Sequence, residues 1–103
     1  MQLELTFYVD DDGMHRARGD DERLATYLET DLQGSVGATT ALIRRLEDAT
    51  FTDDFNGNGH RVDFRENSVS IEALHDPEAP DRVLSRDEML AYAKAWLAFI
   101  SSR

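Results

Sequence analysis

The strongest structural signal in the chain is a helical apolar stripe that begins just after residue 85. A serine and a glutamate at the spacing S-x-x-E, Ser85 and Glu88, form a capping box, which marks the start of a helix. Apolar residues then recur at intervals of three or four, and they include Met89, Leu90, Tyr92, Ala93, Trp96, Leu97, Phe99 and Ile100. This pattern predicts one helix that runs from Ser85 to about Arg103 with one face buried. It also predicts that Trp96 is a core residue and not part of a ligand-binding aromatic set.

A second signal is the alternation of apolar and polar residues between 61 and 73. Val62 and Phe64 alternate with charged residues, and after Glu66-Asn67 the apolar positions are Val69, Ile71 and Ala73. Because side chains alternate between the two faces of a strand, this pattern predicts a hairpin with one buried face. The flanking segments 50–59 and 75–84 are rich in turn formers and contain both prolines, so we expect them to be loops.

The N-terminal half also starts with a strand pattern. Residues 2–9 alternate apolar and polar side chains, Asp10-Asp11-Asp12-Gly13 suits a turn, and residues 14–18 are weakly patterned as a returning strand. Asp20 or Asp21 can then cap a helix in which Leu24, Tyr27, Leu28 and Leu32 have helical spacing. A strand over residues 23–28 is the alternative.

The remaining helix is predicted after Ser35, where residues 34–37 interrupt the preceding pattern. Its apolar positions are Leu42, Ile43, Leu46 and Ala49. The full order is therefore β-β-α-α-β-β-α, and 103 residues are enough for one core but not for two. We expect a single α+β domain over residues 1–103, in which an antiparallel sheet of about four strands carries the helices on one face.

The charge of the chain limits its partners. It has 21 acidic residues against 11 lysines and arginines, for a net charge of −10, and the segment from Glu47 to Glu88 holds 12 acids against 4 arginines. Such a surface repels nucleic acids and anionic membranes and attracts basic proteins at long range. The chain has no cysteine, no apolar run long enough to span a bilayer, and no basic and apolar signal-peptide pattern at residues 1–5. These features predict a cytoplasmic protein.

One motif is similar to the start of a calcium-binding loop. Asp54-Phe55-Asn56-Gly57-Asn58-Gly59 matches the pattern D-x-N-x-N-G. The twelfth position of such a loop needs a bidentate glutamate, but here it is Arg65. We therefore expect a tight turn without calcium, and the sequence predicts no metal and no cofactor.

The histidines offer the only candidates for acid–base chemistry. His60 lies near Asp53, Asp54 and Asp63, but His60 and Asp63 are three positions apart on a predicted strand and so point to opposite faces. The chain has no G-x-S-x-G and no P-loop pattern. We therefore predict that His15, His60 and His75 are solvated surface residues, and that the protein has no catalytic residues and is not an enzyme.

The C-terminal half resembles a known family. Gly59-His60 leads the hairpin through Val62, Phe64, Val69 and Ile71, an acidic loop follows, and the helix ends with the series Tyr92, Trp96 and Phe99. This arrangement over residues 57–103 is similar to the YacL-like group of small acidic bacterial proteins, in which a Gly-His-led hairpin precedes an amphipathic helix. The resemblance implies the fold of this half, but no catalytic residues and no function.

A more general resemblance suggests a function. Small acidic domains without cysteines or catalytic motifs resemble bacterial immunity proteins, including those of contact-dependent growth inhibition. The resemblance implies an inhibitor that neutralises a basic toxin, such as a nuclease, by covering its cationic cleft. The expected contacts are Asp53, Asp54, Asp63, Glu66 and Glu72. Two alternatives are a YacL-like binding protein with another partner, and a small enzyme in which carboxylates and a histidine converge in a pocket.

Overall fold

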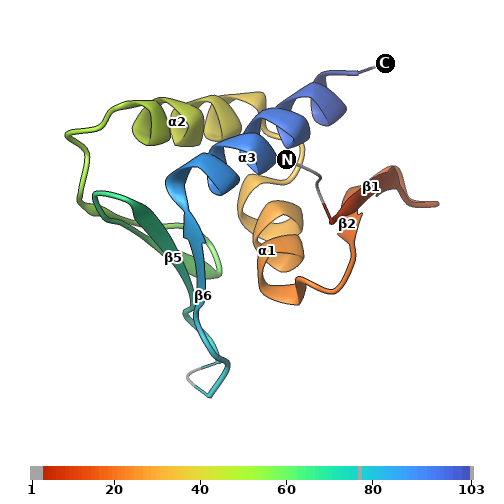
Figure 1. Cartoon of the computed structure of the whole chain (residues 1–103). Coiled ribbons are helices and arrows are strands. Elements are labelled where there is room, and N and C mark those ends of the chain that lie inside the picture. Colours follow the sequence, from red (N-terminus) through yellow and green to blue (C-terminus); the bar gives the residue numbers. More distant parts are fainter. Residues whose placement is uncertain (1–3, 77, 103) are drawn as a thin grey trace.

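The computed structural model describes residues 4–76 and 78–102 of the chain. Two short strands come first, followed by helices, a group of four strands and the C-terminal helix (Figure 1). The strands are β1 (Thr6–Val9), β2 (His15–Arg18), β3 (Asp54–Asn56), β4 (His60–Phe64), β5 (Ser68–Ala73) and β6 (Arg82–Ser85). The helices are α1 (Glu22–Tyr27), the π-helix η1 (Leu28–Leu32), α2 (Val36–Glu47) and α3 (Arg86–Ser101). The predicted α+β class is confirmed.

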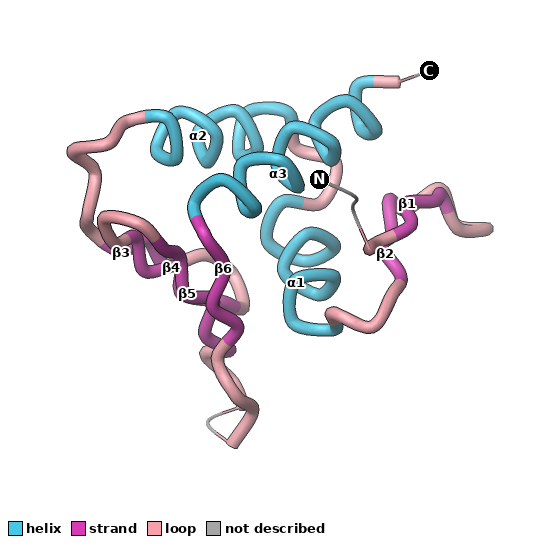
Figure 2. The backbone as a smooth tube through the Cα atoms, viewed as in Figure 1, coloured by secondary structure: helices cyan, strands magenta, loops and turns pink. Residues whose placement is uncertain are grey.

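The strands form two antiparallel sheets. β1 and β2 pair only with each other, whereas β3, β4, β5 and β6 form a four-stranded sheet in the order of the chain (Figure 2). The clearest predicted hairpin, β4 and β5, is at the centre of this sheet, with Val62 opposite Ile71. The prediction that the N-terminal strands share one sheet with this hairpin is wrong, because α1 packs between β2 and β5.

Two segments that we expected to be loops contribute the edge strands. β3 lies within residues 50–59 and β6 within residues 75–84. These strands are three and four residues long, and each presents one apolar side chain to the inner face, Phe55 opposite Val62 and Leu84 opposite Val69. Such short strands carry too little alternation to be recognised from sequence, and pairing with the central hairpin stabilises them.

The helix boundaries follow the predicted caps. The Asp21 carboxylate accepts a hydrogen bond from the Leu24 N–H, so residues 23–28 are helical and not a strand. Ser35 caps α2, and Ser85 and Glu88 form the expected capping box of α3. Arg103, expected beside the last turn of α3, lies outside the described residues. Within residues 4–76 and 78–102, no helix is long and apolar enough to cross a membrane.

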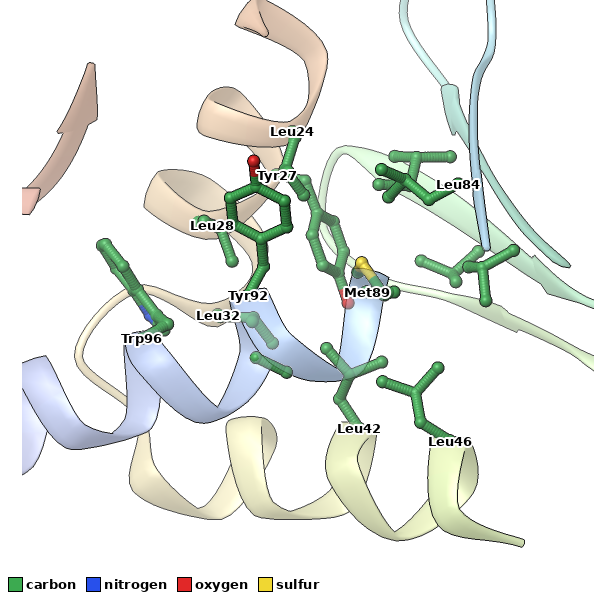
Figure 3. Close-up of a cluster of buried hydrophobic side chains, with 14 of the residues drawn as sticks. Leu24, Tyr27, Leu28, Leu32, Leu42, Leu46, Leu84, Met89, Tyr92 and Trp96 are labelled. Atoms are coloured by element: carbon green, nitrogen blue, oxygen red, sulfur yellow. The ribbon is translucent and has the colours of Figure 1, made fainter. Parts of the chain in front are cut away.

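The core lies between the helices and one face of the four-stranded sheet. α2 and α3 pack against each other, and buried side chains from α1, α2, α3 and β6 meet in the cluster shown in Figure 3. Trp96 is completely buried and its indole N–H donates to the Gln33 carbonyl at 2.8 Å, which confirms its predicted place in the core. The residues of β4 alternate between buried and half-buried, so the sheet buries only one of its faces.

One buried charged residue, Arg86, connects α3 to the end of α2 and to the turn after β4. Arg86, in the first turn of α3, is 8% exposed, and its guanidinium donates to five backbone carbonyls at 2.8–3.1 Å. The accepting carbonyls belong to Arg45, Leu46, Asp48, Phe51 and Arg65. Three of them lie at the C-terminal end of α2, where the partial negative charge of the helix dipole favours a cation.

Candidate functional site

The first candidate site is the outer face of the four-stranded sheet. In the antiparallel register Asp54 is opposite Asp63, and Arg61 is opposite Glu72, so these side chains share the face that points away from the core. We call Asp54, Asp63 and Glu72 the acidic face. The remaining two predicted contact residues are not on it, since Glu66 lies in the turn between β4 and β5, and Asp53 precedes β3 and is exposed beside that turn.

The acidic face is partly neutralised by two arginines. The Asp54 carboxylate lies 2.7 Å from the Arg61 guanidinium, and Asp63 lies 3.1 Å from Arg65. All four side chains are between 31% and 69% exposed. Exposed pairs of this kind contribute about 0–1 kcal/mol to stability, so a cationic partner can displace Arg61 and Arg65 at little cost. Asp54 and Asn56 belong to strand β3, so the first half of the segment that is similar to a calcium loop is part of the sheet, and residues 57–59 form the connection to β4.

The second candidate site is a buried pair that sequence reasoning missed. His60 Nδ1 lies 3.0 Å from the Asp31 carboxylate, and the two side chains are 4% and 3% exposed. Asp31 also accepts hydrogen bonds from the backbone N–H groups of Gly59 and His60, at 3.1 and 3.2 Å. The prediction that His60 is a solvated surface residue is therefore wrong. His60 and Asp63 do occupy opposite faces of β4, as expected.

The π-helix η1 places the Asp31 side chain next to His60, the first residue of β4. Asp31 follows Leu24 by seven positions, which puts it on the apolar stripe of the α1–η1 segment and was the one sequence signal for its burial. Its carboxylate lies so close to Gly57 that a Cβ atom on that residue would overlap it. Gly57 is therefore needed for the approach of η1 to the four-stranded sheet.

His60 also contacts a cation. His60 Nε2 lies 3.3 Å from Arg23 Nη1. Because a guanidinium can only donate, we assign Nε2 as an acceptor and Nδ1–H as the donor to Asp31. The three residues form a connected series, Asp31–His60–Arg23, and His60 and Arg23 line an open pocket of about 410 Å³. In this arrangement the ring nitrogen that would act as a general base is occupied by Arg23, so the geometry favours orientation of the guanidinium over proton transfer.

The other histidines have separate environments. His75 lies at the rim of the same pocket, whereas His15 is in β2 and its ring packs edge-on against Phe99 with a centroid distance of 5.2 Å. Only His75 is thus an exposed residue as predicted, and His15 is half-buried. Among residues 4–76 and 78–102, no three histidine, aspartate or glutamate side chains are arranged to hold a metal ion.

The environment of Asp31 lowers the pKa of its carboxyl group. Burial alone would raise this pKa, but the hydrogen bonds from His60 and Thr30 and the N–H of Gly59 outweigh burial and keep the pKa below its ordinary value of 3.8. The carboxylate therefore stabilises the fold at pH values above 3.8. That contribution is lost as the pH falls through the lower pKa of the folded state.

We expect an acid titration to show this linkage. The free energy of unfolding, measured with urea between about pH 6 and pH 3, should fall more steeply for the wild type than for Asp31→Asn, so that the two curves converge in acid. Asp10 and Asp48 also have lowered pKa values, but they are present in both proteins and cancel in the difference. Parallel curves would contradict the assignment of Asp31 as the buried ionised group.

Comparison with known proteins found no matching family model, and no significant similarity to a curated protein or a solved structure. The resemblances to the YacL-like group and to immunity proteins therefore stay predictions. The acidic face and the Asp31–His60–Arg23 series are the two features of the structure that indicate a function.

Proposed function

We propose that this protein is a non-catalytic inhibitor that binds a basic partner protein through the acidic face. The observation that carries the proposal is the alignment of Asp54, Asp63 and Glu72 on the side of the sheet opposite the core. A strand surface of this kind offers carboxylates at fixed spacings, which suits a partner with several exposed lysines or arginines. In this function the partner is a bacterial toxin such as a nuclease, and binding covers its cationic cleft.

The charge of the whole chain supports the same function. A net charge of −10 attracts a cationic protein beyond direct contact, over a distance of about 10 Å at 0.1 M salt. An inhibitor that acts inside the producing cell benefits from rapid association, because the toxin must be neutralised before it reaches its substrate. The cysteine-free composition suits the reducing cytoplasm, where we place this interaction.

The test compares two charge reversals of equal size. In the face variant, Asp54, Asp63 and Glu72 are replaced by lysine, and in the control variant the same change is made at Asp11, Asp12 and Asp20, which are exposed. Each protein is used to isolate its partner from cells that express the native operon. We expect the wild type and the control to retain a basic protein that the face variant loses, since reversed charges repel a cationic surface.

Stopped-flow association with the isolated partner then tests the mechanism. The association rate of the wild type should fall at least about tenfold between about 0.02 and 0.3 M salt, because screening removes the long-range attraction. A rate that does not change with salt would contradict electrostatic steering. Equal retention of the partner by a folded face variant would contradict the acidic face as the binding surface.

A further inference from the structure

The open pocket beside His60 has a lining that differs from the rest of this acidic protein. It lies between the α1–η1 segment and the ends of β4 and β5, and its wall includes Arg23, Thr26, Asn58 and His75. Hydroxyl, amide and guanidinium groups therefore converge on one space of about 410 Å³. That volume is in the range of sites for small molecules.

Arg23 is held in this wall by two successive contacts. Asp31 fixes the His60 ring through Nδ1, and Nε2 of that ring lies 3.3 Å from Arg23 Nη1. A free arginine side chain would lose much conformational freedom on binding a ligand, and a side chain that is already oriented loses less. The Asp31–His60 pair therefore acts as a positioning device for the guanidinium.

The guanidinium has a donor that makes no hydrogen bond to the described part of the protein. Among the described residues, Arg23 Nε is buried and has no hydrogen-bond partner. Arg23 also forms no ion pair with a carboxylate among residues 4–76 and 78–102. The arginines that form such pairs are Arg16, Arg61, Arg65 and Arg82. A buried donor without a partner is costly. A guanidinium can bind two oxygens of a phosphate or carboxylate at once.

We propose that this pocket binds a small molecule through an oxyanion, a phosphate or a carboxylate, which accepts hydrogen bonds from the guanidinium of Arg23 in the pocket wall. Thr26 and Asn58 add donors on the pocket wall. The negative charge of Asp31 is compensated by its hydrogen bonds from His60, Gly59 and Thr30, whereas Asp76 is exposed at the rim. The site is separate from the acidic face and makes a different kind of contact.

Nuclear magnetic resonance titration of the full chain tests the site. Inorganic phosphate and acetate are added separately to the ¹⁵N-labelled protein at constant ionic strength, and the Arg23 Nε–H signal is followed directly. We expect this signal and the amides of Gly59 and His60 to shift and saturate. The stronger of the two ligands shows whether the natural oxyanion is a phosphate or a carboxylate.

Two variants and a control locate the binding. Arg23→Gln should weaken binding at least about tenfold, the usual effect of losing a charged hydrogen-bond donor. Arg23→Lys should also weaken it, because lysine has the charge but not the planar guanidinium. Arg44→Gln, an exposed arginine of α2, makes the same charge change outside the pocket and should leave binding unchanged.

Three results would each overturn the proposal. An Arg23 Nε–H signal that does not shift in the wild type, non-saturable shifts, or equal affinities of wild type and Arg23→Gln would each reject the site. The titration is independent of the proposed inhibitor function. A face variant that loses the basic partner should still bind the oxyanion, and the Arg23 variants should still bind the basic partner.

Discussion

Replacement of Arg86 by alanine should remove about 3–5 kcal/mol from the free energy of unfolding, because it breaks a buried network of hydrogen bonds from a charged group. The Arg86 guanidinium donates hydrogen bonds to five backbone carbonyls, and alanine cannot replace these bonds. Buried carbonyls without donors carry a desolvation cost, and the end of α2 also loses a favourable charge. Urea unfolding at neutral pH measures the loss.

Two further variants separate the charge of Arg86 from its shape. Lysine keeps the charge but has three donors on a single nitrogen, so Arg86→Lys should recover only part of the lost stability. Arg44→Ala is the control, because Arg44 is exposed, and should change stability by no more than about 0.5 kcal/mol. A loss below about 1 kcal/mol for Arg86→Ala would show that water or other side chains replace the guanidinium.

The second large effect is expected at Trp96. Trp96→Ala should cost about 3–5 kcal/mol, the usual loss for a buried large aromatic residue. The indole is completely buried, donates to the Gln33 carbonyl, and meets the Phe7 ring edge-on at a centroid distance of 5.0 Å. Trp96 therefore connects α3 both to the end of η1 and to the N-terminal hairpin, and its removal loosens both contacts.

The urea midpoint of Trp96→Ala provides the measurement, with Tyr8→Ala as the control. Tyr8 is an aromatic residue of the same hairpin, but it is 37% exposed, so its removal should have a much smaller effect. A loss below about 1 kcal/mol for Trp96→Ala would mean that the indole is not a packing residue. The tryptophan would then have to be reconsidered as part of a binding surface.

Long periodic patterns made the central elements of this fold predictable. α3 has a capping box and a stripe of four turns, and β4 and β5 alternate over several residues on each side of a short turn. In both cases, local signals and burial point to the same structure. The alternation in β4 and β5 also gives the faces of Asp63 and Glu72, so part of the acidic face could be predicted from sequence.

The elements that were missed depend on contacts made after folding. β3 and β6 are strands only because β4 and β5 offer edges to pair with. The N-terminal hairpin forms a separate sheet because its side chains pack on α3, where Phe7 meets Trp96. Neither a three-residue strand nor the choice of sheet partner has a local sequence signal.

The Asp31–His60–Arg23 series could not be predicted from sequence for a similar reason. Asp31 and His60 are 29 residues apart, and only the approach of η1 to β4 brings them together. The environment of Arg86 was even harder to predict from sequence, because it consists of main-chain carbonyls, which every residue type provides. Residue identities can indicate a carboxylate or a histidine, but not the backbone that surrounds a charge.

The position of Arg86 also has a consequence for synthesis of the chain. The five carbonyls that it binds belong to residues 21 to 41 positions earlier in the sequence. On the ribosome these carbonyls are made first, and the guanidinium that they need is added later. A nascent chain that ends before residue 86 contains α2 and the central hairpin but lacks the donor that joins them. Because α3 also supplies Met89, Tyr92 and Trp96 to the core, the core is complete only after α3 has left the exit tunnel, and until then the emerging segment is exposed to chaperones and proteases.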